Sequence, residues 1–196
     1  MLTEKIKKYS IILATQSPRR HYLMKEAGFE FTISDLHSVE ERFPEGLDKF
    51  EIPVYLAEIK SKAYSRPVLK NEILITADTI VWFQNQLIGK PKDRDDAYKT
   101  LQDLSGNMHE VITGVCIRTY DKTYCFHAHT EVFFSKIKES ELNYYIDNFE
   151  PFDKAGAYGI QDWIGFIGIE RIRGSYFNVM GLPIQKLYRE LEKIIS

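Results

Sequence analysis

The junction between two short segments, residues 11–14 and 17–20, most constrains how this chain can fold. Ile11-Ile12-Leu13-Ala14 is an apolar run typical of a buried strand. Ser17 is then expected at the N-cap of a helix and Pro18 at its first helical position, which predicts a helix over residues 18–27. A buried strand that passes directly into a helix is typical of α/β proteins.

Two arginines in the first turn of this expected helix run against local preference. Backbone N–H groups are unpaired there and the helix dipole makes that end positive, so acidic side chains are normally favoured. Arg19 and Arg20 are favourable at this position if the protein binds an anion there, because the helix N–H groups and the two guanidinium groups would then contact the same phosphate. A pair of solvated arginines is the alternative. The pattern makes Arg19 and Arg20 candidate anion-binding residues.

The rest of the chain continues to mix strand-like and helix-like patterns. Strands are expected over residues 29–33, 73–77, 80–83, 86–88, 111–119, 122–134 and 166–172. Helices are expected over residues 52–65, 93–104, 140–148 and 183–195, with Ser140 as one N-cap. Long antiparallel strands combined with strand–helix pairs predict an α/β fold, a mixed sheet with flanking helices. The chain length predicts a single domain over residues 1–196, built as one body or as two closely joined lobes without a linker.

Composition and charge narrow the classes of partner. The chain has 196 residues, 44% of them hydrophobic and 28% charged, which is typical of a globular protein with a substantial core. A formal net charge of −2 argues against broad nucleic-acid binding. No stretch approaches the roughly 20 apolar residues of a membrane span, and no signal peptide is recognisable. Neither nucleic acid nor membrane is therefore an expected partner.

The two cysteines both lie in strand-like segments. Cys116 and Cys125 belong to no CxxC motif and to no Cys/His spacing typical of a metal site. This usage predicts reduced thiols in a cytoplasmic protein, and a cross-strand disulfide is the alternative.

Acidic residues at two places are candidates for metal or water chemistry. Asp78 follows the apolar run 73–77 and is expected to end that strand. A carboxylate at a strand end can hold a hard cation or orient a water molecule, although a turn or capping role is the alternative. Glu41, the second acid of Glu40-Glu41, is a candidate second metal ligand, with an isolated surface acid as the alternative.

Two lysines are candidate phosphate partners. Lys90 lies between Gly89 and Pro91, which restrict the backbone and so limit where the ammonium group can go. Lys60 lies on an expected helix, where a solvated face is the alternative. No GxxxxGK[ST] or GxGxxG motif is present, so neither lysine belongs to a phosphate-binding loop of those types.

The run from Asp153 to Gln161 combines Asp153-Lys154 with several small residues. Small residues allow the backbone to approach a ligand closely, and an amide such as Gln161 can read a base edge because it offers both donors and an acceptor. An ordinary glycine-containing turn is the alternative.

His109 could act as a base, but a hydrogen-bonded structural histidine is the favoured interpretation.

Several runs, taken together and in order, resemble the Maf family of nucleoside triphosphate pyrophosphatases. The matching runs are Ala14 to Arg20; Leu56-Ala57 with Lys60; Ala77-Asp78-Thr79; Gly89-Lys90-Pro91; Leu104-Ser105-Gly106 with His109, Val111, Thr113 and Gly114; Asp153 to Gln161; and Gly174-Ser175-Tyr176 with Asn178 and Gly181-Leu182-Pro183. The chain departs from the family pattern at Thr15-Gln16 and at Glu40-Glu41, and neither departure removes a functional group.

This resemblance implies a mixed α/β sheet in two lobes around a deep cleft, similar to that of inosine triphosphatases (the Maf/Ham1 type). It implies hydrolysis of dTTP and UTP, including modified pyrimidine nucleotides, to the monophosphate and pyrophosphate, with Mg²⁺ or Mn²⁺ as cofactor. Such an enzyme would cleanse the nucleotide pool. Family members are often dimeric, which leaves a homodimer open.

By position, the resemblance also assigns roles to single residues. Asp78 would be the active-site acid that activates water and would share the metal with Glu41. Ser17, Arg20, Lys60, Lys90 and Lys154 would bind the triphosphate. Arg19, Thr79 and Gln161 match positions associated with substrate choice. The alternatives are the same chemistry on a purine nucleotide or 7-methyl-GTP, and a non-catalytic, nucleotide-binding regulator of septum formation.

Overall fold

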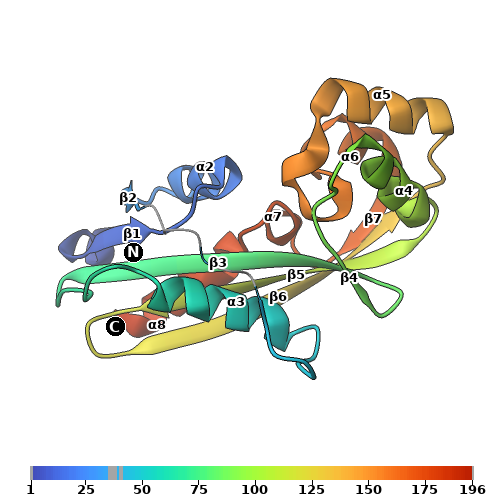
Figure 1. The fold of residues 1–196 in the computed structure, drawn as a ribbon. Helices are drawn as coiled ribbons and strands as arrows, with labels where there is room; N and C mark the ends of the chain where they lie inside the picture. Colours follow the sequence, from blue (N-terminus) through green and yellow to red (C-terminus); the bar gives the residue numbers. More distant parts are fainter. Residues whose placement is uncertain (1, 35–38, 40–41, 196) are drawn as a thin grey trace. The chain divides into compact units, whose positions relative to one another are not determined.

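A computed structural model describes residues 2–34, 39 and 42–195, and its central feature is a mixed β-sheet (Figure 1). The strands of the described residues are β1 (Ser10–Leu13), β2 (Phe31–Ile33), β3 (Glu72–Phe83), β4 (Gln86–Ile88), β5 (Met108–Arg118), β6 (Thr123–Phe134) and β7 (Ile169–Arg173). Their order is β2-β1-β3-β5-β6-β7, and β4 pairs with β3 outside this path.

The sheet contains both parallel and antiparallel pairs. Strand β1 is parallel to both of its neighbours, with Ile11 opposite Phe31 of β2 and Ile73 of β3. Strand β4 is antiparallel to β3, and β7 is antiparallel to β6. A strand with parallel neighbours on both sides is usually apolar along its length, and β1 buries its last three residues. The predicted α/β fold with a mixed sheet is confirmed.

Helices occupy most of the chain between the strands. The α-helices of the described residues are α1 (Leu2–Lys5), α2 (Pro18–Glu26), α3 (Glu51–Lys62), α4 (Arg94–Leu104), α5 (Glu139–Phe149), α6 (Trp163–Gly168), α7 (Tyr176–Val179) and α8 (Ile184–Ile194). Single 3₁₀ turns form at Ile6–Lys8, Pro151–Asp153 and Ala155–Ala157. Among the described residues, no helix is both long enough and apolar enough to cross a membrane.

The chain divides into two compact units. The first contains Met1–Asp78, Thr113–Ala128 and Gly181–Ser196, and the second contains Thr79–Ile112 and His129–Met180. The division falls within strands β3, β5 and β6, each of which contributes residues to both units.

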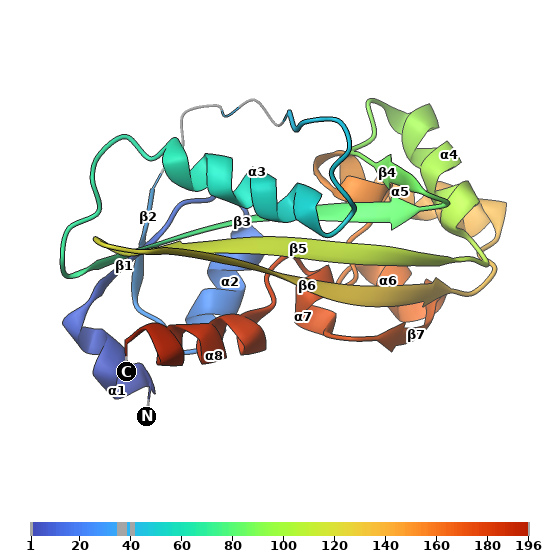
Figure 2. The same cartoon turned by 90° about the horizontal axis from the view of Figure 1, so that it is seen from below.

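In the first unit, α3 lies along one side of the strands and α8 lies on the other side (Figure 2). Gly114 of β5 explains how closely α3 can approach, because a Cβ atom built on Gly114 would lie 2.1 Å from the carbonyl oxygen of Pro53. The hydroxyl of Thr76 donates to the carbonyl of Ala57 at 2.6 Å and ties the same helix to β3. Helix α3, which carries Lys60, is therefore held close to the sheet.

In the second unit, helices α4 and α5 lie side by side (Figures 1 and 2). Asp93 caps α4, since its carboxylate accepts a hydrogen bond from the N–H of Asp96 at 2.9 Å. Arg94 then donates to Asp147 of α5 at 2.7 Å and to the side chain of Asn143 at 2.9 Å. These bonds connect the start of α4 to the outer face of α5.

The structure corrects the expectation that Asp78 ends its strand. Strand β3 continues without a break to Phe83, so Asp78 lies inside it. The residues after Asp78 continue the strand because Ile80 and Val81 are buried, and Val81 pairs with Ile88 of β4. The predicted hairpin across Gln84-Asn85 is confirmed, since Phe83 pairs with Gln86.

Two further element boundaries differ from the sequence prediction. Helix α5 begins after Lys138, not at Ser140, because the Glu141 carboxylate accepts the Lys138 N–H at 2.8 Å and closes the first turn earlier. The expected strand over 166–172 is a helix as far as Gly168 and a strand from Ile169 onwards. The neighbouring strand β6 ends at Phe134, which pairs with Ile169, so its pairing with β7 begins at Ile169.

The cysteines also differ from the favoured prediction of reduced thiols. The structure joins Cys116 of β5 to Cys125 of β6 by a disulfide. The connecting turn is closed by a hydrogen bond from the N–H of Thr119 to the carbonyl of Lys122. Cys116 lies three residues before Thr119, and Cys125 lies three residues after Lys122. The two cysteines therefore face one another across the strands, with Cα atoms 4.1 Å apart. The alternative of a cross-strand disulfide is the observed one.

Candidate active site

Arg20, in the first turn of α2, connects the strand–helix junction to other segments of the first unit. Its Nε donates to the carbonyl of Gly181 at 2.8 Å, and its Nη1 donates to the carbonyl of Ala77 at 2.9 Å. Nη1 also lies 3.3 Å from Oγ1 of Thr15. The guanidinium group is thus held beside Ala77, the residue directly before Asp78 on β3.

The start of α2 has the predicted form with one difference. Ser17 occupies the N-cap and Pro18 the first turn, but the Ser17 side chain makes no capping hydrogen bond. The Ser17 N–H instead donates to Oγ1 of Thr15 at 3.2 Å. Thr15 is one of the departures from the family pattern, and here it positions both the Ser17 backbone and Arg20.

Lys60 and Asp78 form the central ion pair of the first unit. The Lys60 ammonium group bonds to Oδ1 of Asp78, and the side chains of the two residues are only 15% and 10% exposed. Lys60 comes from α3 and Asp78 from β3, so the tertiary structure joins two candidates that lie 18 residues apart. A paired carboxylate at this depth is a strong acceptor, and its neighbour supplies positive charge for an anion.

The second unit brings two lysine-bearing segments together. The N–H of Gly156 donates to the carbonyl of Gly89 at 3.1 Å, which ties the 153–161 run to the segment that carries Lys90. Lys90 is exposed, whereas the Lys154 side chain is only 13% exposed and bonds to Asp153 at 2.7 Å. Thr79 follows Asp78 on β3 and is half-buried.

Gln161 belongs to a hydrogen-bonded group that the sequence did not indicate. Its Nε2 donates to Oδ1 of Asp162 at 3.0 Å, and the hydroxyl of Tyr145 donates to Oδ2 of Asp162 at 2.9 Å. Lys154 lies 3.8 Å from the same Oδ2. Asp162 and Tyr145 were missed because no spacing rule connects α5 to the 153–161 run, and the adjacency of Asp162 to Gln161 was the single available signal.

His109 has the structural role that the sequence favoured. Its Nε2 lies 2.7 Å from the hydroxyl of Tyr158, and its ring packs edge-on against Phe134 and Tyr158. Burial lowers the pKa of His109 to about 3, and burial raises the pKa of the Tyr158 hydroxyl. Both groups are therefore neutral at physiological pH, and they attach the 153–161 run to β5.

The residues present are compatible with a divalent cation. No group of three or more His, Cys, Asp or Glu side chains forms a metal site in the described ranges. Mg²⁺ needs no such cage, since one or two carboxylates can hold it together with substrate phosphates and water. Asp78 offers one such carboxylate, while Glu41, the other predicted ligand, lies outside the described residues.

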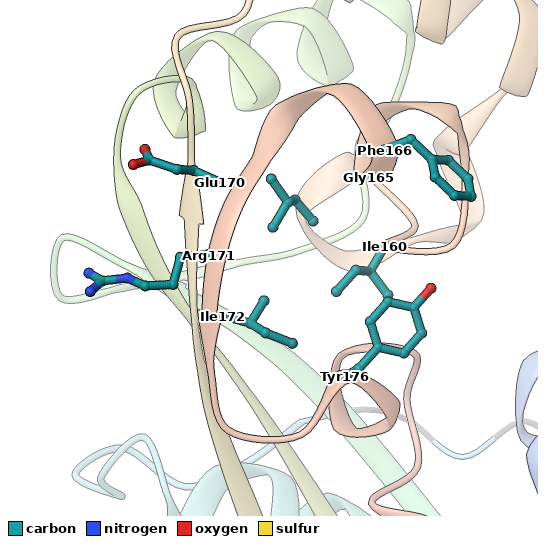
Figure 3. Close-up of a pocket in the computed structure, with 8 residues that line it drawn as sticks. Ile160, Gly165, Phe166, Glu170, Arg171, Ile172 and Tyr176 are labelled. Atoms are coloured by element: carbon teal, nitrogen blue, oxygen red, sulfur yellow. The ribbon is translucent and has the colours of Figure 1, made fainter.

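A separate pocket lies in the second unit beside α6 and β7 (Figure 3). Its apolar lining includes Ile160, Ile172 and Tyr176, and Figure 3 shows the charged groups of Glu170 and Arg171 pointing away from these side chains. The lining includes none of the residues predicted to bind substrate.

The fold is similar to that of two solved Ham1 structures. The Staphylococcus aureus Ham1 protein matches with a TM-score of 0.52 at 14% identity, over 94% of this chain and 99% of that chain. A Ham1 protein from Coxiella burnetii matches with a TM-score of 0.51 at 12% identity, over the same shares of 94% and 99%. This likeness defines the class of protein by fold, an α/β protein of the Ham1 type, as predicted.

Sequence comparison then identifies the family. The family model described as Maf-like protein matches residues 10–194. Curated relatives named dTTP/UTP pyrophosphatase include proteins from Parabacteroides distasonis, 49% identical over 97% of this chain and 99% of its own, and Bacteroides fragilis, 51% identical over 95% and 97%. One from Flavobacterium johnsoniae is 47% identical over the full length of both chains, 100% and 100%. The chain belongs to the Maf family.

Proposed function

We propose that this protein is a nucleoside triphosphate pyrophosphatase that hydrolyses dTTP and UTP to the monophosphate and pyrophosphate. The observation that carries the proposal is the buried pair of Asp78 with Lys60, in a chain whose curated relatives are named dTTP/UTP pyrophosphatase. The proposal treats residues 1–196 as one functional domain, and a homodimer in the cytoplasm remains a prediction.

Asp78 is the residue proposed to act on water. Its carboxylate would orient a water molecule, and accept its proton, for attack on the α-phosphorus atom of the substrate. The bond from the α-phosphorus to the bridging oxygen then breaks, and pyrophosphate leaves. Lys60 would hold Asp78 in place before substrate arrives and would face the negative charge that the triphosphate brings.

The leaving group needs positive charge, and five residues are proposed to hold the triphosphate: Ser17, Arg20, Lys60, Lys90 and Lys154. Cations and N–H groups aimed at the phosphate oxygens lower the barrier because charge moves onto the pyrophosphate as the bond breaks. Asp78 and Glu41 are proposed to hold Mg²⁺ or Mn²⁺. When bound, such a cation neutralises phosphate charge and lowers the pKa of a coordinated water molecule.

Selection of the base is assigned to Arg19, Thr79 and Gln161. The Gln161 amide can both donate to and accept from the edge of a pyrimidine. Its restrained position beside Asp162 supports this role, since a group that discriminates between bases has to be held in one orientation.

The test is pyrophosphate release from dTTP, UTP, CTP, dATP, GTP and 7-methyl-GTP with Mg²⁺ or Mn²⁺. We expect metal-dependent release from dTTP and UTP, and a fall of about 10²–10⁴-fold in the Asp78→Asn variant, since that is the usual contribution of general acid–base catalysis. Asp121→Asn, in the turn between β5 and β6, is the matched control and should retain activity.

Three other results would change the proposed substrate, the proposed activity or the proposed role of Asp78. Release confined to a purine nucleotide or 7-methyl-GTP would keep the reaction and overturn the base assignment. No release from a folded protein that still binds nucleotide would favour the non-catalytic regulator of septum formation. Substantial activity in Asp78→Asn with metal present would remove Asp78 from its proposed role.

A further inference from the structure

The Gln161 amide is held by one end. Nε2 of Gln161 donates to Oδ1 of Asp162 at 3.0 Å. An ionised carboxylate only accepts hydrogen bonds, so the end of the amide that faces Asp162 has to be the nitrogen. The chemistry of Asp162 thereby decides which way round the amide lies.

The other end of the amide is left without a partner. Oε1 of Gln161 is buried and accepts no hydrogen bond within the described part of the chain. A buried carbonyl oxygen without a donor costs about 1–3 kcal/mol, so such an atom calls for an explanation. The Gln161 side chain as a whole is half-exposed, so a ligand can approach it while the bond to Asp162 is kept, and an N–H group of that ligand would supply the missing donor.

Asp162 is itself fixed from α5. The hydroxyl of Tyr145 donates to Oδ2 of Asp162 at 2.9 Å and accepts the N–H of Gly159 at 3.1 Å. The Tyr145 side chain is fully buried, so its hydroxyl is a fixed point. A Cβ atom on Gly159 would lie 2.6 Å from both Oδ2 of Asp162 and Nε2 of Gln161, so the group requires glycine there.

We propose that Asp162, held by Tyr145, is a positioning residue that turns the carbonyl oxygen of Gln161 towards the base. Uracil and thymine carry an N3–H donor that this oxygen can accept, whereas N3 of cytosine is itself an acceptor and would be repelled. The inference rests on the proposed function and adds to it a physical reason for choosing uracil and thymine over cytosine.

The decisive variant is Asp162→Asn. An asparagine can offer either its oxygen or its nitrogen to Gln161, so the Gln161 amide is free to turn over and present its donor to cytosine. We expect the ratio of kcat/KM for UTP to that for CTP to fall by about tenfold or more, since a site built to hydrogen-bond a substrate discriminates mainly through that bond. Circular dichroism and thermal unfolding would check the fold.

Three comparison variants separate positioning from general damage. Tyr145→Phe removes the hydroxyl alone and should lower the ratio by less than Asp162→Asn. Asp153→Asn is the matched control, because Asp153 also pairs with Lys154 but its side chain is 63% exposed. It should change KM for UTP and CTP alike and keep their ratio. Gln161→Ala should remove discrimination, and adding Asp162→Asn to it should change the ratio little further.

The outcomes distinguish this inference from the proposed function. If the wild type hydrolyses UTP in preference to CTP and folded Asp162→Asn keeps that ratio, the positioning role is overturned while the proposed function stands. Equal losses on both nucleotides would also overturn it. If Asp162→Asn fails to fold, an unchanged ratio in Tyr145→Phe has the same meaning. A wild type without pyrophosphatase activity contradicts the proposed function itself.

Discussion

At the scale of single residues, burial and the nearest partner determine whether an ionisable side chain such as His109 or Asp78 is held neutral or paired. His109 has a pKa of about 3 because burial disfavours its charged form, so the ring stays neutral. Asp78 is also buried, at 7% exposure, but it has the Lys60 ammonium group as a partner. The sequence favoured the structural role of His109 from local context, yet it could not predict which cation would reach Asp78.

His109 makes the stability of the protein depend on pH. Its folded pKa lies below the unfolded value near 6.5, so its contribution is complete above about pH 6.5 and is lost as pH falls from there towards 3. The loss from this one group is about 1.4 kcal/mol per pH unit within that window.

Urea unfolding of the wild type and His109→Gln at pH 7, 6 and 5 measures this contribution. Glutamine can bond to Tyr158 and does not titrate, so the free energy of unfolding of the variant should fall less steeply with acidification. Parallel profiles for the two proteins would show that His109 does not set the acid sensitivity.

At the scale of elements, close packing places the candidate residues. Helix α3 lies so near β5 that Gly114 has no room for a side chain, and that helix carries Lys60. Strand β3 continues through Asp78 because it is buried on both sides of that residue, pairing with β1 up to Ile75 and with β4 from Val81. The periodicity of the sequence predicted both helix α3 and strand β3. It ended the predicted strand too early, because the single acidic residue Asp78 was interpreted as the end of the strand.

Gly114→Ala tests this packing. The added methyl group would meet the Pro53 carbonyl oxygen at 2.1 Å, and backbone atoms of α3 cannot move aside cheaply. We expect a loss of about 1–3 kcal/mol or more in the free energy of unfolding, as in other overpacked cores, and a fall in kcat as Lys60 shifts.

Gly89→Ala is the matched control for stability, since nothing lies within 4 Å of the added Cβ atom. Equal stability of Gly114→Ala and Gly89→Ala, measured by urea unfolding, would contradict the close approach of α3 to β5.

At the scale of the whole molecule, the proposed substrate-binding residues are distributed over both compact units. Ser17, Arg19, Arg20 and Lys60 belong to the first unit, while Thr79, Lys90, Lys154 and Gln161 belong to the second. Each proposed lysine can be tested by itself, because neutralising a cation that contacts the triphosphate should weaken nucleotide binding.

A UTP analogue with a non-hydrolysable α–β bridge provides the measurement. At about 100 times Kd a ligand stabilises the folded state by about 2.7 kcal/mol, which for a chain of this size raises Tm by about 5–10 °C. Lys60→Ala and Lys154→Ala should each reduce that rise at the same analogue concentration, with Mg²⁺ present throughout. A full rise in Lys154→Ala would remove Lys154 from the proposed binding residues.

The sequence by itself determined the class of fold, the strand–helix junction at Ser17 and the order of the motifs that mark the family. Those features depend on near neighbours in the chain, so periodicity and spacing reveal them. The tertiary structure alone decided that Lys60 pairs with Asp78, that Cys116 is bonded to Cys125 and that Tyr145 holds Asp162 beside Gln161. These contacts join residues that chain folding brings together, and no local pattern records which of many polar side chains will meet in the packed interior.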